Sequence, residues 1–184
     1  MKKDIILIGP MNAGKSVLGR LLAEALNLPQ VSLDDIRWGY YEEIGYDNEK
    51  AGEIHENEGV DGLLRYWKPF EAHSVARLLE DHENCIFDFG AGHSVYEEED
   101  LFARVESALS PYENVILVIP SPDPDESIAI LRQRPFEGPL FALDINEHFV
   151  RHPSNERLAK HIVYTKDKTP EESRDEILKL IGHM

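Results

Sequence analysis

Residues 5–16 read IILIGPMNAGKS, an apolar β-branched run that leads directly into the pattern GxxxxGK[ST]. The run at 5–8 predicts a short strand that is buried on both faces of a sheet. Behind the pattern, apolar residues recur at helical spacing as far as Leu26, and Asn27 and Pro29 mark the end of that helix. A strand, a glycine-containing loop and a helix in this order are typical of a phosphate-binding P-loop, which is our interpretation of residues 9–16.

The residue types in this loop suit the binding of a nucleotide. Two glycines let the backbone curl so that successive amides point at a phosphate, and the helix N-terminus adds a positive dipole end. Lys15 is predicted to reach the β- and γ-phosphates, and the Ser16 hydroxyl to bind Mg²⁺. ATP and Mg²⁺ are therefore the expected cofactors. The predicted nucleotide-binding residues of the loop are Gly9, Asn12, Ala13, Gly14, Lys15, Ser16 and Val17.

Further apolar runs alternate with helix-period segments, which predicts an α/β fold with a mostly parallel sheet. Three helices have capping signals, each an Asp or Thr followed three residues later by Glu, at Asp123, Asp144 and Thr169. Residues 36–67 follow no regular period and are predicted to form short helices and loops. No linker or repeat divides the 184 residues, so we expect a single domain over 1–184. The other expected strands are 30–33, 85–89, 114–119 and 161–165.

The composition excludes several classes of partner. The formal charge of −16 repels nucleic acid and anionic membrane surfaces. No apolar run approaches the ~20 residues that span a bilayer, and the single cysteine cannot form an internal disulfide. A cytoplasmic protein is the simplest interpretation. The eight histidines show no pair at metal-ligand spacing on an evident helix, so we expect them in surface or core roles.

Two acidic positions are candidates for chemistry. Asp88 ends the apolar run at 85–89, where it either holds Mg²⁺ together with Ser16 or caps the following turn. The cost of burying a carboxylate without a cation or donors favours the first interpretation. Asp34 and Asp35 follow the second expected strand, and either could accept the proton of an attacking hydroxyl while the other caps the next helix.

Arginines and aromatic residues supply further candidates. Arg132, Arg134 and Arg151 stand out in an acidic chain, either as donors to a transferred phosphoryl group or as solvated surface pairs. Residues 134–139 read RPFEGP and are interpreted as a loop that closes over the phosphates. The aromatics between 36 and 67 either pack a small cap onto the sheet or stack on a flat substrate.

Residues 5–28, IILIGPMNAGKSVLGRLLAEALNL, resemble the opening of shikimate kinases and of the small P-loop kinases related to them. The resemblance continues in order along nearly the whole chain through shorter motifs. It implies a P-loop NTPase three-layer fold, with a five-stranded parallel sheet in order 2-3-1-4-5, helices on both faces and a short lid at 132–150. It also implies ATP-dependent transfer of the γ-phosphoryl group to a hydroxyl of a small metabolite.

The resemblance also implies roles for individual residues. Asp34 would hold the accepting hydroxyl, Arg132 and Arg134 would lie near the nucleotide, and Arg151 would bind a substrate carboxylate. The predicted catalytic residues are thus Lys15, Asp34 and Arg134. Residues 90–92 stand where the family has three glycines beside the substrate. The predicted acceptor-binding residues are Asp34, Lys68, Gly90, Ala91, Gly92 and Arg151.

The acceptor half departs from the family pattern. Ser32 stands where the family has a first Asp, and Asp88 is the candidate to take over its work with Mg²⁺. Lys68 falls near a substrate-binding Arg and lacks the bidentate fork that fits a carboxylate. Ala91 replaces the middle glycine, and residues 36–70 form a longer acceptor-binding region than in typical members. We therefore expect a relative that phosphorylates something other than shikimate.

The expected acceptor is a small hydroxylated molecule that is also anionic or ring-bearing, bound by a monomer or a homodimer. Asp34 would act on its hydroxyl either as a base or as an orienting group. Two alternatives remain open. One is a nucleoside, nucleotide or antibiotic kinase in which Trp38 or Tyr41 stacks on a ring. The other, suggested by Ser32, is a nucleotide-binding switch without a small acceptor.

Overall fold

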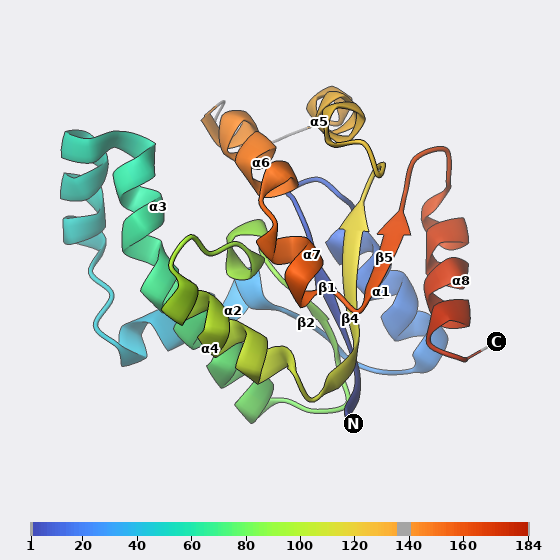
Figure 1. Cartoon of the computed structure of the whole chain (residues 1–184). Coiled ribbons are helices and arrows are strands. Elements are labelled where there is room, and N and C mark those ends of the chain that lie inside the picture. The colour runs from blue at the N-terminus through green and yellow to red at the C-terminus, as the bar shows by residue number, and fades with distance from the viewer. Residues whose placement is uncertain (1, 136–140, 184) are drawn as a thin grey trace.

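The computed structural model describes residues 2–135 and 141–183, and it contains one five-stranded parallel sheet in the order β2-β3-β1-β4-β5 (Figure 1). This order and all five expected strands are confirmed, with ends that differ by a few residues. The strands are β1 (Lys2–Ile8), β2 (Gln30–Ser32), β3 (Ile86–Asp88), β4 (Tyr112–Ile119) and β5 (His161–Tyr164). The helices are α1 (Lys15–Leu26), α2 (Leu33–Glu43), α3 (Asn48–Asp81), α4 (Glu99–Leu109), α5 (Pro124–Gln133), α6 (Phe141–Arg151), α7 (Ser154–Leu158) and α8 (Pro170–Leu180), with a 3-10 turn η1 (Ala91–Ser94).

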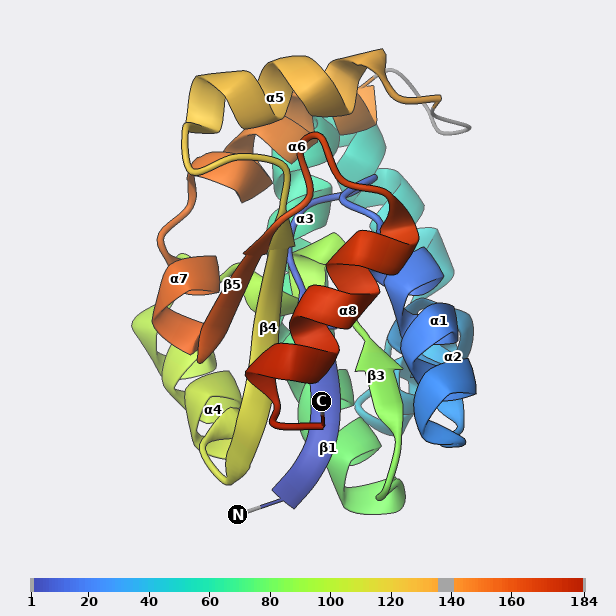
Figure 2. The same cartoon turned by 90° about the vertical axis from the view of Figure 1, so that its right-hand side faces the viewer.

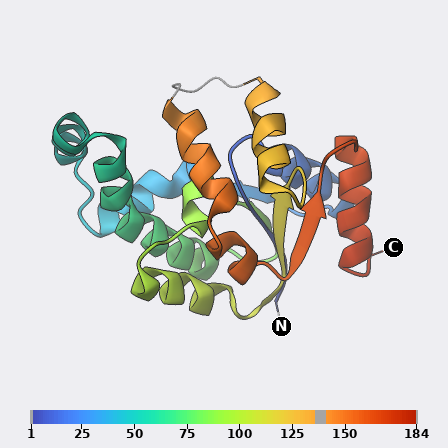
Figure 3. The same cartoon turned by 45° about the horizontal axis from the view of Figure 1, so that its top comes forward.

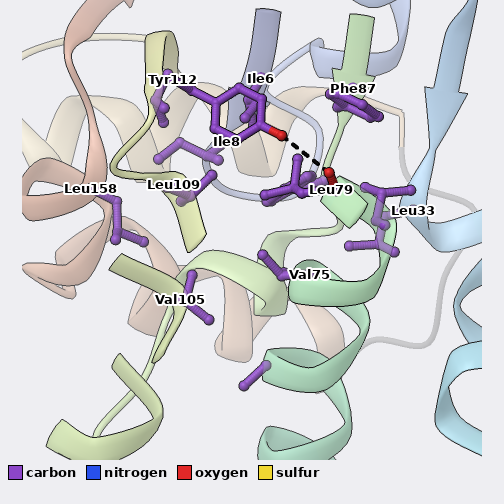
Figure 4. Close-up of a cluster of buried hydrophobic side chains, with 14 of the residues drawn as sticks. Ile6, Ile8, Leu33, Val75, Leu79, Phe87, Val105, Leu109, Tyr112 and Leu158 are labelled. Carbon is purple, nitrogen blue, oxygen red and sulfur yellow. Dashed lines mark hydrogen bonds between the residues drawn. The ribbon is translucent and has the colours of Figure 1, made fainter. Parts of the chain in front are cut away.

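The central strand β1 supplies apolar side chains to both faces of the sheet. Ile6 and Ile8 pack into the cluster formed with α3 and α4, whereas Ile5 and Leu7 pack against α1 and α8. Figure 4 shows the first cluster, in which the Tyr112 hydroxyl donates to the Leu79 carbonyl at 3.3 Å. The helices accordingly lie in two layers, with α1 and α8 on the face that Figure 2 brings forward. Burial of each such side chain contributes about 1.5–3 kcal/mol to folding.

Two of the three predicted caps are present in the described side chains. Asp123 accepts a hydrogen bond from the Asp125 amide at the start of α5. Thr169 and Glu172 form a reciprocal capping box at the start of α8. The side chain of Asp144 falls outside the described part of the chain. The helix that follows the P-loop ends at Asn27 in a left-handed conformation, as its stop signal predicts.

The segment between the second and third strands is more regular than the sequence predicts. Two helices, α2 and α3, occupy most of it, and the connection at 44–47 separates them. The expected helices over 36–67 are therefore present, but loops form less of the segment than expected. Gly59, with φ of 68° and ψ of −159°, breaks α3 into two straight parts. The first part projects from the body of the molecule in Figure 1. Its apolar residues therefore do not recur on one face of the helix, and the sequence shows no helical period there.

The carboxyl ends of the strands meet at one edge of the sheet, where α5 and α6 also lie side by side (Figure 3). The parallel ladders pair Leu7 with Asp88 and Ser32 with Asp88 at this edge. The loop after β1, the start of α2 and the segment after β3 are thus brought together. Ligands of open parallel sheets bind at this edge.

Candidate active site

The loop after β1 has the conformation that a phosphate-binding loop needs. Gly9 has φ of 130°, and a Cβ atom there would lie 2.4 Å from the Val118 carbonyl oxygen, so only glycine fits. Lys15 is buried, and its Nζ donates to the Gly9 and Pro10 carbonyls at 2.9 and 2.8 Å. Burial lowers the Lys15 pKa to about 8, although the nearby carboxylates of Asp34 and Asp88 oppose the shift. The ammonium is therefore held beside the loop amides.

Asp88 lies at the centre of a group of oxygen atoms. Its side chain accepts hydrogen bonds from the Ser16 hydroxyl at 3.2 Å, the Ser32 hydroxyl at 3.0 Å and the Gln30 amide. Carboxylate and hydroxyl oxygens are the ligands that Mg²⁺ prefers, so Ser16 and Asp88 fit the ion predicted for them. Gln30 carries no sequence signal for this role, because only the β2–β3 pairing brings it to Asp88.

A cavity of about 370 Å³ opens beside this carboxylate. Of the two candidate acids at the start of α2, Asp34 and Asp35, only one is among the residues that line this cavity. Asp35 lines this cavity. Asp34 instead lies against Gly90, where a Cβ atom would come within 2.2 Å of the Asp34 Oδ1 atom. Arg37 donates to the same oxygen at 2.9 Å. Asp34 is thus the carboxylate that faces the end of β3.

Arg134 lies at the P-loop, where it was predicted. Its guanidinium donates to the Asn12 carbonyl at 2.6 Å and to the Thr165 hydroxyl at 3.3 Å. Burial lowers the pKa of this arginine. A second cavity, of about 260 Å³, lies beside it. That cavity is lined by Ala13, Gly14, Val17, Leu18, Arg134, Thr165, Lys168, Pro170 and Ser173. The β5–α8 residues in this set were missed by the sequence analysis because they carry no nucleotide-binding motif. Of the phosphate-covering loop interpreted at 134–139, residues 136–139 fall outside the described residues.

Arg132 and Arg151 lie elsewhere, at the contact between α5 and α6. Arg132 pairs with Glu147 at 3.1 Å. Arg151 pairs with Asp125 at 2.5 Å and with Glu147 at 3.2 Å. Arg151 does not line any of the three cavities described here, and Arg132 does not either. In this structure the chain therefore does not bring these two arginines to the cavity beside the P-loop or to the cavity of about 720 Å³ on the other side of α6 from α5.

A third cavity, of about 720 Å³, lies between α3, the start of α4 and α6. We call it the acceptor-side cavity. It is lined by Val60, Asp61, Leu64, Arg65, Lys68, Glu97, Glu98, Ile145 and His148. Helix α6 is tied to the P-loop next to it, since the Asn146 side chain accepts from the Met11 amide at 2.7 Å and donates to the Met11 carbonyl at 3.1 Å. Asn146 was not predicted, because a lone Asn within a helix pattern carries no signal.

The predicted acceptor-binding residues other than Arg151 lie close together. Lys68 Nζ donates to Glu71 at 2.7 Å and to the Gly92 carbonyl at 3.0 Å. Glu71 in turn lies against Gly92, where a Cβ atom would come within 2.2 Å of Glu71 Oε1. Ala91 packs with Val95 and Phe149. The glycines at 90 and 92 thus leave room for one carboxylate each.

The aromatic residues of the acceptor-side region pack against one another. Ring centroids lie 5.5 Å apart for Tyr41 and Tyr46, 5.2 Å for Tyr46 and Phe70, and 5.1 Å for Tyr66 and Phe70. Tyr41 is buried, and the acceptor-side cavity is lined by no aromatic residue in the described part of the chain. The geometry supports the interpretation of a packed cap for these rings. Trp38 is 40% exposed, and its stacking on a flat substrate stays a prediction.

The histidines hold one arrangement that the sequence analysis missed. Glu97, His148 and His152 bring their ligand-type atoms within 4.8 Å of one another, a set that also suits a transition metal. His148 hydrogen bonds Glu97 at 2.7 Å, and this bond is the main reason that the Glu97 pKa falls to about 2. His152 Nδ1 accepts from the Ser154 amide at 3.2 Å. The two histidines are four residues apart at the end of α6, so the expectation of no such pair was wrong.

No helix in the described ranges, 2–135 and 141–183, is long and apolar enough to cross a membrane.

Comparison with known proteins gives a consistent picture. The family model for shikimate kinase matches residues 11–182. A shikimate kinase from a Marinomonas species is 33% identical over 59% of this chain, and the match spans only 54% of that relative. One from Alteromonas mediterranea is 28% identical over 98% of both chains. The solved shikimate kinase from Acinetobacter baumannii in complex with shikimate superposes with a TM-score of 0.63 at 21% identity, covering 98% of this chain and 93% of that one. At that identity the likeness shows the fold alone.

Proposed function

The chain belongs to the shikimate kinase family, and we propose that it is an ATP-dependent kinase that transfers the γ-phosphoryl group to a hydroxyl of a small metabolite. One observation carries this proposal. Lys15, Asp88 and Asp34 converge at the carboxyl edge of the sheet, and a separate cavity of about 720 Å³ opens on the acceptor side. A nucleotide and a second substrate can therefore occupy neighbouring places.

On the nucleotide side, the loop amides and Lys15 hold the β- and γ-phosphates. Ser16 and Asp88 would hold Mg²⁺, which would supply positive charge to the phosphates. Arg134 donates to the P-loop carbonyl of Asn12 at 2.6 Å, which places its guanidinium beside the loop that would hold the phosphates. Its always-charged fork suits the stabilisation of charge on the transferred group.

On the acceptor side, Asp34 holds the hydroxyl that attacks. The hydroxyl oxygen forms a bond to the γ-phosphorus while the bond to the bridging oxygen of ADP breaks, and the hydroxyl proton leaves toward the Asp34 carboxylate. Bond formation lags in a loose transition state, so this proton moves late. Positioning is therefore the main contribution of Asp34, and Gly90 leaves the space in which it does so.

We further propose a single cytoplasmic domain that acts as a monomer or a homodimer, without nucleic-acid or membrane partners. The net charge of −16 supports the last two points, because it repels polyanionic surfaces. Residues 36–70 are proposed as the acceptor-binding region, since several cavity-lining side chains lie between 60 and 68.

The test is ADP release from Mg·ATP in the presence of hydroxylated acceptors. The panel contains shikimate, sugar acids, neutral polyols, amino sugars and nucleosides. Lys15→Ala is the blank, and Lys179→Ala on the exposed end of α8 is the matched control. Stimulation by one acceptor class in the wild type and in the control, but not in the blank, would support the kinase. ATP hydrolysis that no acceptor changes would instead favour the switch without an acceptor.

A further inference from the structure

Two side chains with a permanent positive charge, Arg65 and Lys68, line the acceptor-side cavity, and both are already paired with a carboxylate. Lys68 is 4% exposed and gives two of its three N–H donors to Glu71 and the Gly92 carbonyl. Because Glu71 is equally buried, the pair is close to neutral as seen from the cavity. An arginine at this position would keep further donors for a ligand, and a lysine does not.

The arginines of this region bond to carboxylates as well, although the buried Nε of Arg37 has no hydrogen-bond partner among the described residues. Arg65 bonds Glu58 at 2.8 Å on the rim, and Arg37 gives Nη1 to Asp34 at 2.9 Å. Arg151 points to Asp125 and Glu147 of α5 and α6. The sequence from 136 to 144, FEGPLFALD, contains no Lys, Arg or His. Within the described residues, no unpaired cation lines the cavity.

The acidic side chains of the same cavity are differently placed. Asp61 and Glu98 are exposed and form no ion pair or hydrogen bond through their side chains within 2–135 and 141–183. Glu97 hydrogen bonds the imidazole of His148 at 2.7 Å. Three carboxylates therefore face a space in which the lysine is neutralised. A carboxylate ligand would meet repulsion there, and an ammonium would meet attraction.

We propose that the acceptor of this kinase is a cationic polyol, that is, a hydroxylated sugar or cyclitol that carries a protonated amine, with Asp61, Glu97 and Glu98 as its counter-charges. The inference rests on the proposed function and specifies its substrate class. Asp34 would hold the hydroxyl that receives the phosphoryl group, while the amine lies toward the α3–α4 side of the cavity. The three acids thus act as specificity-determining residues.

Matched acceptors test the charge directly. ADP release is measured with three ligand sets that differ mainly in charge: glucosamine, glucose and gluconate, and then 2-deoxystreptamine, inositol and shikimate. We expect the amine-bearing member of at least one set to give the highest kcat/KM, with added salt reducing its advantage. A carboxylate member that is used best would overturn the inference and leave the kinase intact, and would indicate that Arg37 or Lys68 binds it. A neutral member used best would also overturn it. No stimulation by any member above the Lys15→Ala blank would overturn both proposals.

Variants then connect the preference to the named residues. The double variant Asp61→Asn/Glu98→Gln should lower kcat/KM for the cationic acceptor about tenfold, because two exposed counter-charges are lost. The KM for ATP and the rate with the neutral acceptor should not change. Glu24→Gln, an exposed acid on α1 away from the cavity, is the control. An equal loss with cationic and neutral acceptors would contradict the assignment of these acids.

A complementary variant reverses the charge balance. Glu71→Gln frees the Lys68 ammonium and should raise kcat/KM for the carboxylate member relative to the cationic one. Because Glu71 is buried, the unfolding midpoint is measured beside the kinetics, and Lys68→Arg offers a second route that keeps the pair. If both variants fold and neither moves the ratio toward the carboxylate, Lys68 does not determine the charge of the acceptor, which contradicts the inference.

Discussion

Ser32 and Asp88 lie opposite each other in the parallel ladder of β2 and β3, and the Ser32 hydroxyl donates a hydrogen bond to Asp88 Oδ1 at 3.0 Å. The family pattern that the chain resembles has a carboxylate at the first of these positions. Here the carboxylate is that of Asp88 on the neighbouring strand β3, and the hydroxyl of Ser32 on β2 donates to it. Two carboxylates at this distance would repel each other, so one acid and one donor form a stable pair.

The first prediction exchanges these two roles. Asp88→Asn should lower kcat about 10–100-fold and raise the Mg²⁺ concentration needed for half-maximal rate, because the group that orients the ion is lost. Adding Ser32→Asp to that variant should recover much of the rate, since the carboxylate returns to the same edge from the opposite strand. Ser32→Asp alone should not improve activity. A double variant no better than Asp88→Asn would show that the two positions are not equivalent for Mg²⁺.

The second prediction concerns the pH dependence of ATP binding. Burial lowers the Lys15 pKa to about 8 in the protein without nucleotide, and the charged phosphates of ATP favour the protonated lysine. The dissociation constant for ATP should therefore be flat below pH 7.5 and rise above pH 8, by up to about tenfold per pH unit.

Isothermal titration calorimetry between pH 6.5 and 9.5 measures this dependence. Lys15→Arg is the matched control, because its guanidinium stays charged over the whole range. The same lowered pKa means that folding disfavours the charged lysine. The unfolding free energy should accordingly gain a contribution as the pH rises from about 8 toward the ordinary lysine value. An ATP affinity that is independent of pH in the wild type would exclude the deprotonation of Lys15.

The third prediction tests the space that Gly90 leaves for Asp34. A Cβ atom at position 90 would lie 2.2 Å from Asp34 Oδ1, so Gly90→Ala must displace that carboxylate. A displacement of about 1 Å at a reacting group costs about 100-fold in rate. We expect kcat to fall by that order while ATP affinity is unchanged. Gly52→Ala, at a helical glycine with no atom near the added Cβ, is the control and should stabilise the protein by about 0.5–1 kcal/mol.

The fourth prediction concerns the buried pair of Lys68 and Glu71. Removing one charge leaves the other buried and unpaired, so Lys68→Met should lower the unfolding free energy by about 3–5 kcal/mol. The double variant Lys68→Met/Glu71→Leu should recover most of that loss, because no buried charge remains. Urea unfolding monitored by tryptophan fluorescence gives both values. Equal losses in the single and double variants would show that the pair is screened by solvent.

Most of the secondary structure could be predicted from local sequence patterns. Strand-like runs and capping residues predict the five strands and the starts of helices. The P-loop motif predicts the positions of Lys15 and Ser16. The order of the strands in the sheet came from the family resemblance instead. These features depend on neighbours in the sequence, so they can be recognised without the fold. Residues 36–67 could not be predicted in the same way, because α3 is broken at Gly59 and several of the aromatic rings pack on one another.

The sequence by itself determined that this chain has a P-loop on a parallel sheet, because a phosphate cradle needs a short continuous motif whose every residue has a local task. The tertiary structure alone decided which charges are available to an acceptor. Lys68 and Arg151 read as free cations along the chain. The packing of α3 against η1 buries Lys68 together with Glu71 and brings the Gly92 carbonyl to its ammonium, and the packing of α5 against α6 brings Asp125 to Arg151. A side chain's charge is encoded by its residue type, but its burial and its partners on other elements are set only when distant segments meet.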